Sequence, residues 1–344
     1  MNLKRLYILI FSLFLIIVGV LAFNFYNKIY TSNTTREGYL YIPTNSEYSD
    51  VENLIRPFLK RVKPFALVVK IKNYSNAVKP GKYLIKEGMS SMELVNLLRS
   101  GKQSMVNLSF NNQDTFEKLA GRISSQIEAD SISLLNVFNE TAFLNESGFD
   151  VNTALGMYIP NSYEFYWNTS AKLFRSKMLD EYNRFWNESR IQKTKKLNLS
   201  KIEVITLASI VQKETSNVRE RPIVAGLYLN RLNDQWPLQA DPTIIFALKQ
   251  QQGNDMIIKR VLKKDLDVDS PYNTYKNIGL PPGPISMPDI SSIDAVLNSK
   301  KHDYYYMCAS INNIGTHEFA KTLSQHNKNA SIYQNWLNKQ GVNR

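Results

Sequence analysis

Cysteine and histidine are scarce in this sequence. Cys308 is the only cysteine among the 344 residues, so no disulfide bond can form within the chain. This fits a cytosolic protein, or an exported protein that does not rely on disulfides. There are three histidines, and the separation of His317 from His326 matches no usual zinc-ligand spacing. The sequence therefore predicts neither a metal site nor another cofactor.

Clustered charge and repeated sequence are also lacking. The net charge is +12, from 42 Lys and Arg against 30 Asp and Glu, which favours acidic surroundings such as nucleic acid, anionic lipid or an anionic polymer. The basic residues are scattered, however, and the clusters at 190–196 and 259–264 are short, so we expect no nucleic-acid binding. There is no internal repeat or low-complexity block. The length and the 43% hydrophobic content predict a folded chain of two modest domains.

Only one apolar run is long enough to cross a membrane. Residues 6–23 are uncharged and apolar, and Lys4 and Arg5 precede them. A cleaved signal peptide usually has a shorter apolar core, and Val20-Leu21-Ala22 is a poor cleavage site, so we expect an uncleaved anchor. The two basic residues place the N-terminus in the cytoplasm. We therefore predict a cytoplasmic tip and transmembrane anchor in the cytoplasmic membrane over 1–26, a polar tether over 27–37, and an exported remainder.

The next segment has the pattern of a small domain. A strand is expected at 39–43, followed by two helices, a turn at 79–82 and a second strand at 83–86. A third helix should begin after Ser90 and close at Gly101. This order resembles the LysM-like module of cell-wall proteins. We predict a LysM-like module over 38–105 and a mixed α+β domain over 106–344, so that the fold class is α+β.

Residues 200–215 form the most informative predicted helix. Ser200 and Glu203 make a capping box, and Leu207, Ile210, Val211 and Glu214 share one face. A carboxylate at the end of an apolar stripe lies partly in low dielectric, where its pKa rises. Such a group can stay protonated near neutral pH and donate a proton. The alternative is that the stripe turns into solvent and Glu214 is merely exposed.

Loops that are rich in amide and aromatic side chains surround this helix in the sequence. We expect a loop at 158–165, a helix at 222–232, a turn at 239–243, rigid loops at 272–275 and 279–284, and polar segments at 315–319 and 324–327. Sugars present hydroxyl groups at their edges and C–H groups on their faces, which such side chains bind well. Each motif alone is also compatible with an ordinary turn.

Taken together, these motifs resemble a known family. ASIVQKET, YLNRL, LQADPT, PYNTY, GLPPGPI, HEF and SQHNK occur in the order and spacing of the YceG-like endolytic murein transglycosylases. The similarity spans most of 39–340 and is densest over 208–327. It implies a membrane-anchored lyase that cuts the peptidoglycan glycan strand between N-acetylmuramic acid and N-acetylglucosamine, leaves 1,6-anhydromuramoyl ends and limits strand length. Glycan strands, and cell-wall synthases in the membrane, are the implied partners.

The resemblance also implies the site residues. The catalytic acid of the K-E-T triplet corresponds to Glu214, and Gln212 stands where many members carry a second glutamate. Pro284 replaces a common alanine. The implied substrate-binding residues are Asn230, Gln239, Asp241, Tyr272, Asn273, Thr274, Tyr275, His317 and Asn327.

One carboxyl group can suffice for this chemistry. Glu214 would protonate the glycosidic oxygen and then accept the proton of the muramoyl C6 hydroxyl, with Asp241 or an amide steadying the positive charge. Two other functions remain open. The first is a muramidase-type glycoside hydrolase in which Asp241 delivers water. The second is a non-enzymatic scaffold that binds the cell wall.

Overall fold

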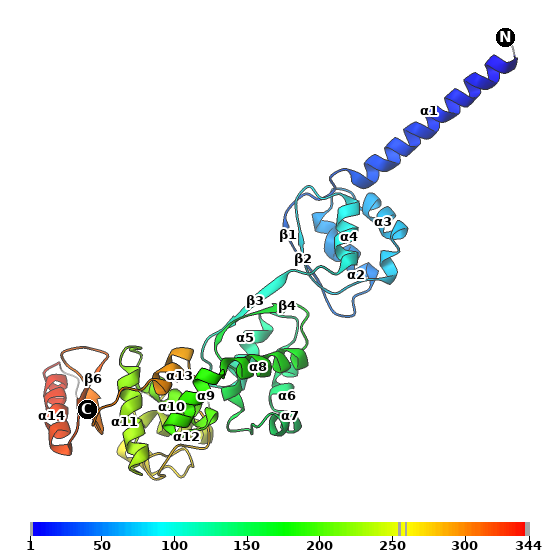
Figure 1. Ribbon diagram of the computed structural model, residues 1–344. Helices are drawn as coiled ribbons and strands as arrows, with labels where there is room; N and C mark the ends of the chain where they lie inside the picture. Colours follow the sequence, from blue (N-terminus) through cyan, green and yellow to red (C-terminus); the bar gives the residue numbers. More distant parts are fainter. Residues whose placement is uncertain (1–2, 254–255, 259, 341–344) are drawn as a thin grey trace. The chain divides into compact units, whose positions relative to one another are not determined.

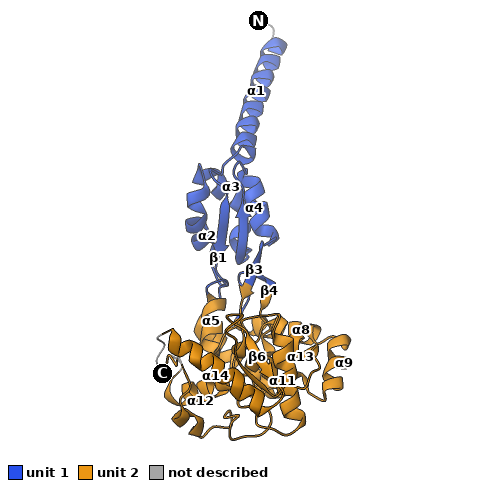
Figure 2. Cartoon of the chain, turned by 90° about the vertical axis from the view of Figure 1, so that its left-hand side faces the viewer, with its two compact units in different colours: residues 1–108, 125–129, 163–170 blue, residues 109–124, 130–162, 171–344 orange. Residues whose placement is uncertain are grey.

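The computed structural model describes residues 3–253, 256–258 and 260–340, and the chain divides into two compact units (Figures 1 and 2). Unit 1 comprises Met1–Leu108, Ser125–Ala129 and Tyr163–Ser170, and unit 2 comprises Ser109–Ser124, Asp130–Ser162 and Ala171–Arg344. Two later segments thus join unit 1, in addition to the region before the predicted boundary at 105. Helices and strands are mixed, as the α+β prediction required.

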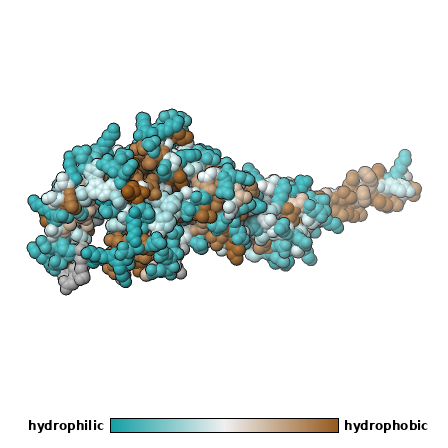
Figure 3. Space-filling view, turned by 90° about the horizontal axis from the view of Figure 1, so that it is seen from below, coloured by the Kyte–Doolittle hydropathy of each residue, from teal (hydrophilic) through white to brown (hydrophobic). Residues whose placement is uncertain are grey.

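Unit 1 begins with a long apolar helix, α1 (Leu3–Tyr30), which contains the predicted anchor at 6–23. Its apolar side chains are exposed along the membrane-length run, and Figure 3 shows a mostly brown surface there. By length and composition α1 could cross a membrane, a test that a signal sequence also passes. The helix extends into the predicted tether, where Ile29 is buried in the core of unit 1.

The rest of unit 1 closely follows the predicted elements. In chain order they are β1 (Gly38–Ile42), α2 (Tyr48–Ile55), η1 (Arg56–Phe58), α3 (Val62–Ile71), η2 (Tyr74–Asn76), β2 (Gly81–Ile85) and α4 (Ser91–Ser100). The two strands are antiparallel, with Gly38 opposite Ile85. Ser90 caps α4, and Gly101 ends it in the left-handed conformation, which glycine adopts without steric cost.

The predicted tether differs most from expectation. Asn33 and Thr34 are fully buried. The Asn33 amide donates to the carbonyl of Arg61 (2.8 Å), and the Thr34 hydroxyl donates to the carbonyl of Lys86 (2.8 Å). Buried carbonyls require hydrogen-bond donors, so the polar composition of this segment serves its packing.

The remaining elements begin with β3 (Met105–Phe110), which pairs with β4 (Asn161–Tyr166). The predicted loop at 158–165 therefore contains a strand. The helical elements are α5 (Phe116–Ser124), α6 (Ser131–Phe138), α7 (Thr141–Glu146), η3 (Ala154–Met157), α8 (Ala171–Phe185), α9 (Glu188–Leu197), α10 (Lys201–Glu214), α11 (Arg221–Asn233), α12 (Asp241–Gln252), η4 (Lys263–Asp267), α13 (Ile290–Leu297) and α14 (Leu323–Lys339). Strands β5 (Tyr306–Ala309) and β6 (His317–Ala320) form an antiparallel hairpin.

Helix α10 is the centre of unit 2. Its capping box is formed as predicted, because the Ser200 hydroxyl accepts from the Glu203 amide and the Glu203 carboxylate accepts from the Ser200 amide. Helices α11, α12 and α13 pack around it, so every residue from Val204 to Gln212 is buried. The sequence predicted one apolar face, but the structure covers all of them. Ser209 can lie inside because its hydroxyl donates to the Thr206 carbonyl and accepts from the Ile285 amide.

Candidate active site

Glu214 is the last residue of α10, and its carboxyl group is crowded by protein while remaining partly exposed. The hydroxyl of Tyr228, on α11, donates a hydrogen bond of 2.6 Å to Glu214 Oε1. Tyr228 is only 1% exposed, so the packing of α11 against α10 holds this donor in place. The carboxyl group is therefore oriented, and it is not a freely rotating surface acid.

The pKa of Glu214 is raised from 4.5 to about 7, mainly by burial and to a smaller extent by the negative charge of Asp241. The Tyr228 hydrogen bond and the positive charges of His317 and Arg231 act in the opposite direction, since they favour the carboxylate. A carboxyl group balanced in this way is present in both protonation states near neutral pH. It can therefore donate a proton and later accept one.

Asp241 begins α12, and the hydroxyl of Tyr275 donates to its Oδ1 over 2.6 Å. Burial, followed by the hydrogen bond to Asp241, raises the pKa of Tyr275, so the phenol keeps its proton. Asp241 itself is exposed. The tyrosine thus fixes one oxygen of this second carboxylate and leaves the other accessible.

His317, at the start of β6, is held by a residue to which no sequence pattern pointed. Glu220 is 6% exposed, and it accepts the backbone N–H of His317 (2.6 Å) and Nδ1–H of the ring (2.9 Å). With Nδ1 committed, Nε2 is the ring nitrogen that remains for other partners. Glu220 lies immediately before α11 without a motif of its own, and only the fold brings it to His317.

Arg231 is a second contributor that was not among the predicted site residues, although the YLNRL motif contains it. It is buried, and it donates to the carbonyl of Tyr305 through Nε (2.8 Å) and Nη2 (2.6 Å), and to the carbonyl of Leu238. Its charge stays close to Glu214 because backbone carbonyls fix the guanidinium.

Three predicted site residues support the backbone. The Asn230 amide donates to the carbonyls of His302 and Tyr304. Asn273 is 0% exposed, donates to the carbonyls of Leu266 (2.9 Å) and Val268 (2.8 Å), and accepts from the Tyr275 amide (3.0 Å). The hydroxyl of Thr274, also buried, accepts from the Ala240 amide. Asn273 and Thr274 hold the loops that position Asp241 and Tyr275, whereas Asn230 fixes the segment that precedes β5.

The other predicted residues lie in different surroundings. Gln239 is exposed, with a positive φ of 50°, and its backbone N–H donates to the Thr274 carbonyl. Tyr272 is buried against Phe246 and lines a separate cavity. Asn327, on α14, lines another cavity with Cys308 and His326.

The residues grouped around Glu214 are thus Tyr228, Arg231, Asp241, Tyr275 and His317. Within the described residues, no three His, Cys, Asp or Glu side chains are placed to hold a metal ion.

Comparisons with known proteins agree on one family. The model of the YceG-like family matches residues 40–332. An endolytic murein transglycosylase of Bacillus subtilis (strain 168) is 30% identical over 310 residues, which is 85% of this chain and 83% of that protein. An endolytic murein transglycosylase of Streptococcus pneumoniae serotype 2 (strain D39 / NCTC 7466) is 27% identical over 325 residues, which is 86% of this chain and 58% of that protein.

A solved structure extends the likeness to the fold. The crystal structure of a YceG-like protein from Listeria monocytogenes matches with a TM-score of 0.57 and 28% identity, covering 85% of this chain and 98% of that one. The family match spans unit 1 from β1 onward as well as the elements that carry Glu214, Asp241 and His317. The chain belongs to the YceG-like family.

Proposed function

We propose that this chain is a membrane-anchored endolytic transglycosylase that cleaves peptidoglycan glycan strands, with Glu214 as general acid and general base. The observation that carries the proposal is the oriented carboxyl group at the end of α10, whose pKa is raised to about 7. The names of the curated relatives, endolytic murein transglycosylases, support the substrate class.

The reaction needs two proton transfers, the first from Glu214 to the leaving oxygen and the second from the muramoyl C6 hydroxyl to Glu214. Protonated Glu214 donates to the oxygen that links C1 of N-acetylmuramic acid to N-acetylglucosamine, and that C–O bond breaks through an oxocarbenium-like transition state. The carboxylate then removes the proton of the muramoyl C6 hydroxyl, whose oxygen bonds to C1. No water is consumed, and Glu214 ends in its original protonation state. The products are a 1,6-anhydromuramoyl end and a free N-acetylglucosamine hydroxyl.

The surrounding groups would serve this cycle in distinct ways. Asp241, fixed by Tyr275, is the negative charge that can stabilise the oxocarbenium-like centre. Its charge also helps to keep Glu214 protonated before the reaction. Arg231 and His317 favour the carboxylate, which is the state that the second step requires. The opposing charges therefore prevent Glu214 from being trapped in either form.

The N-terminal half would bring the enzyme to its substrate. We propose that α1 is an uncleaved single-pass anchor with its N-terminus in the cytoplasm, and that the module after it is LysM-like and binds glycan. The strand–helix–helix–strand order of β1, α2, α3 and β2 supports this assignment. An anchored endolytic enzyme would meet strands as membrane-bound synthases release them, and would limit their length.

The test uses the full-length protein in detergent with purified sacculi, and mass spectrometry of the released muropeptides. Wild type should release anhydro fragments, one water lighter than hydrolysis products. Glu214→Gln should lower the rate by about 10²- to 10⁴-fold, because Gln keeps the shape but has no proton to give. Glu203→Gln, at the other end of α10, is the matched control, since its amide oxygen can still accept from Ser200.

Other outcomes would identify the alternatives. Reducing ends from wild type would favour a hydrolase in which Asp241 activates water. Glycan binding without cleavage would favour a scaffold. If Glu214→Gln releases anhydro products at the wild-type rate, the assignment of the acid fails.

A further inference from the structure

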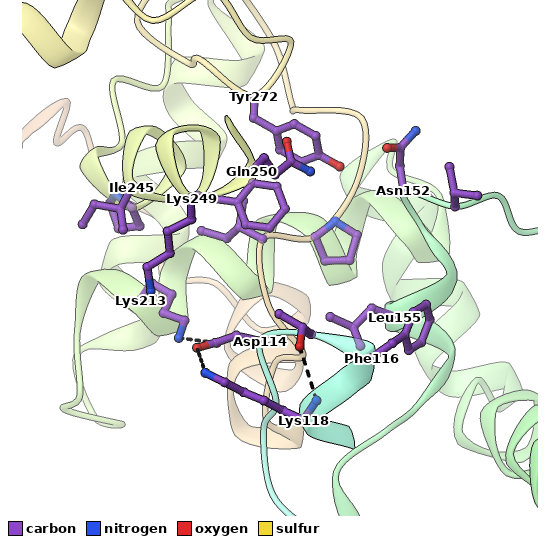
Figure 4. A pocket seen from close by; sticks show the side chains of 16 residues that line it. Asp114, Phe116, Lys118, Asn152, Leu155, Lys213, Ile245, Lys249, Gln250 and Tyr272 are labelled. Carbon is purple, nitrogen blue, oxygen red and sulfur yellow. Dashed lines mark hydrogen bonds and ion pairs between the residues drawn. The ribbon is translucent and has the colours of Figure 1, made fainter. Parts of the chain in front are cut away.

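A second cavity, beside the candidate site, has no role in the proposed cleavage. It encloses about 320 Å³ within unit 2, and Figure 4 shows the side chains that line it. Its apolar wall comes from α5, α12, the segment around 155 and the segment at 284–285. This wall includes Phe116, Leu155, Ile245, Phe246 and Pro284. The volume is that of a small ligand-binding pocket.

The rim of this cavity is positively charged. Lys118 and Lys213 both approach Asp114, at 3.9 and 2.7 Å, as the dashed lines in Figure 4 show. Lys249, on α12, makes no ion pair among the residues that the structure describes. Three lysines against one aspartate leave a net positive rim above an apolar wall. The amides of Asn152 and Gln250 add polar groups.

The cavity and the candidate site are built from the same elements. Lys213 precedes Glu214 on α10, Pro242 follows Asp241 on α12, and Tyr272 begins the loop that carries Tyr275. Because successive helical residues point about 100° apart, Lys213 and Glu214 face different sides of the end of α10. The cavity and the candidate site therefore lie on different sides of the same elements.

Close packing holds one wall of the cavity. A Cβ on Gly283 would lie 2.2 Å from the backbone oxygen of Asn152, so only glycine allows the GLPPGPI loop to approach this segment. Pro284 and Asn152 are therefore brought to the cavity by backbone contact. The loop that contains the GLPPGPI motif therefore forms part of the cavity wall.

We propose that this cavity binds the stem peptide that peptidoglycan carries on its muramoyl residues. The proposal rests on the proposed function, because it deepens the assignment of the substrate. A stem peptide combines small methyl side chains with free carboxylates and amide groups. The apolar wall suits the methyl groups, Lys249 suits a carboxylate, and the two amides suit the peptide backbone.

The proposal requires the peptide to extend from the glycan strand at Glu214 into a cavity that is lined by the preceding residue of the chain, Lys213. An extended chain spans about 3.3–3.6 Å per residue, so a peptide of four residues covers roughly 13–14 Å. In this proposal the peptide occupies the cavity while the glycosidic bond lies at Glu214, whose neighbour Lys213 lines the cavity. Simultaneous occupancy makes peptide binding intramolecular, which strengthens the binding of strands that carry peptides. Strands that have lost their peptides lack this contribution.

The first experiment measures substrate preference with the full-length protein. The two substrates are glycan strands with their stem peptides and the same strands after an amidase has removed the peptides. Wild type should cut the peptide-bearing strands faster, on the order of tenfold. Lys249→Glu should bring the ratio of the two rates close to one. Lys195→Glu, an exposed lysine in the last turn of α9, is the matched control and should keep the wild-type ratio.

The second experiment measures binding without catalysis. Titration calorimetry with the free stem tetrapeptide should detect binding to wild type and to Lys195→Glu, and about tenfold weaker binding to Lys249→Glu. Equal rates on both substrates together with no peptide binding would overturn the cavity assignment and leave the proposed function intact. A preference or binding that Lys249→Glu does not change would also overturn it. Peptide binding that depends on Lys249, without cleavage of any glycan, would support the cavity while the proposed function fails.

Discussion

Helices α1 and α10 are both apolar around most of their circumference, yet they lie in opposite surroundings. No residue of the apolar window of α1 is buried in protein, whereas every residue from Val204 to Gln212 of α10 is covered by neighbouring helices. Lipid could cover α1 but would offer no polar partners in its hydrocarbon region. Protein covers α10 and also supplies donors to the Ser209 hydroxyl, from the Ile285 amide, and to Gln212 Oε1, from the Ser292 hydroxyl.

This difference explains why only α10 can end in an oriented carboxyl group with a raised pKa. A carboxyl group needs low dielectric to raise its pKa and fixed donors to remain oriented. The end of α10 has both, in the burial of Glu214 and the hydroxyl of Tyr228. The surroundings of a helix, rather than its hydropathy, decide this property.

Introducing an aspartate into each helix tests whether their surroundings differ in this way. Ile210→Asp, at a position that is 0% exposed, should cost about 4–5 kcal/mol or more and unfold unit 2, because the charge has no partner. Ile16→Asp, where the side chain is 62% exposed, should leave both units folded. It should weaken membrane retention by about 2.5–3.5 kcal/mol. Urea unfolding and vesicle flotation measure the two effects. Unfolding by the Ile16 variant would contradict the comparison.

The raised pKa of Glu214 predicts a pH dependence that α1 cannot have. The folded state binds this proton more tightly (pKa about 7) than the unfolded state (about 4.5), so the stabilisation is complete below pH 4.5 and is lost as the pH rises through 7. The free energy of unfolding should fall by about 3 kcal/mol if the carboxyl group is fully buried. For a partly exposed group the decrease should be on the order of 1–2 kcal/mol. Glu214→Gln should remove this dependence, as urea titrations at pH 4.5 and 8 will measure.

Catalysis by the protonated form gives the second part of this prediction. The cleavage rate of wild type should fall as the pH rises above about 7, where the acid is lost. Parallel stability curves for wild type and Glu214→Gln across this range would show that the carboxyl group is solvated.

Substitutions of Asn273 and Tyr275 should distinguish a residue that supports the loop from a residue that acts on Asp241. Asn273→Ala leaves the carbonyls of Leu266 and Val268 without donors, so it should destabilise the protein by about 2–3 kcal/mol. Tyr275→Phe should change stability by less than about 1 kcal/mol, yet slow cleavage by freeing Asp241. Melting temperatures and initial rates distinguish the two. Equal effects on stability would mean that both residues only shape the loop.

The smallest effect should come from Tyr228→Phe. Removing the hydroxyl removes a hydrogen bond that favours the carboxylate, so the pKa of Glu214 should rise. The alkaline limb of the pH–rate profile should therefore move to higher pH, while the maximal rate stays within about tenfold. A shift to lower pH would show that Tyr228 stabilises the protonated form instead.

Local signals in the sequence predicted most of the elements. The Ser200–Glu203 capping box, the closing glycine at 101 and the strands of the small module act over a few residues, and the structure contains them as expected. The strand β4 escaped prediction because its partner β3 is distant in sequence. The burial of Asn33 and Thr34 was not predicted either, because polar side chains indicate an exposed tether. Only the structure shows the buried carbonyls to which these side chains donate.

The sequence by itself determined the family, the one apolar run and the position of Glu214 at the end of a capped helix. The tertiary structure alone decided what surrounds that carboxyl group. Glu220 reaches His317 across 97 residues, Tyr275 reaches Asp241 across 34, and Arg231 is fixed by a carbonyl 74 residues away. No local pattern encodes such pairs, because caps and periodicity report only neighbours along the chain. The pKa of a buried acid depends on the groups that folding brings around it.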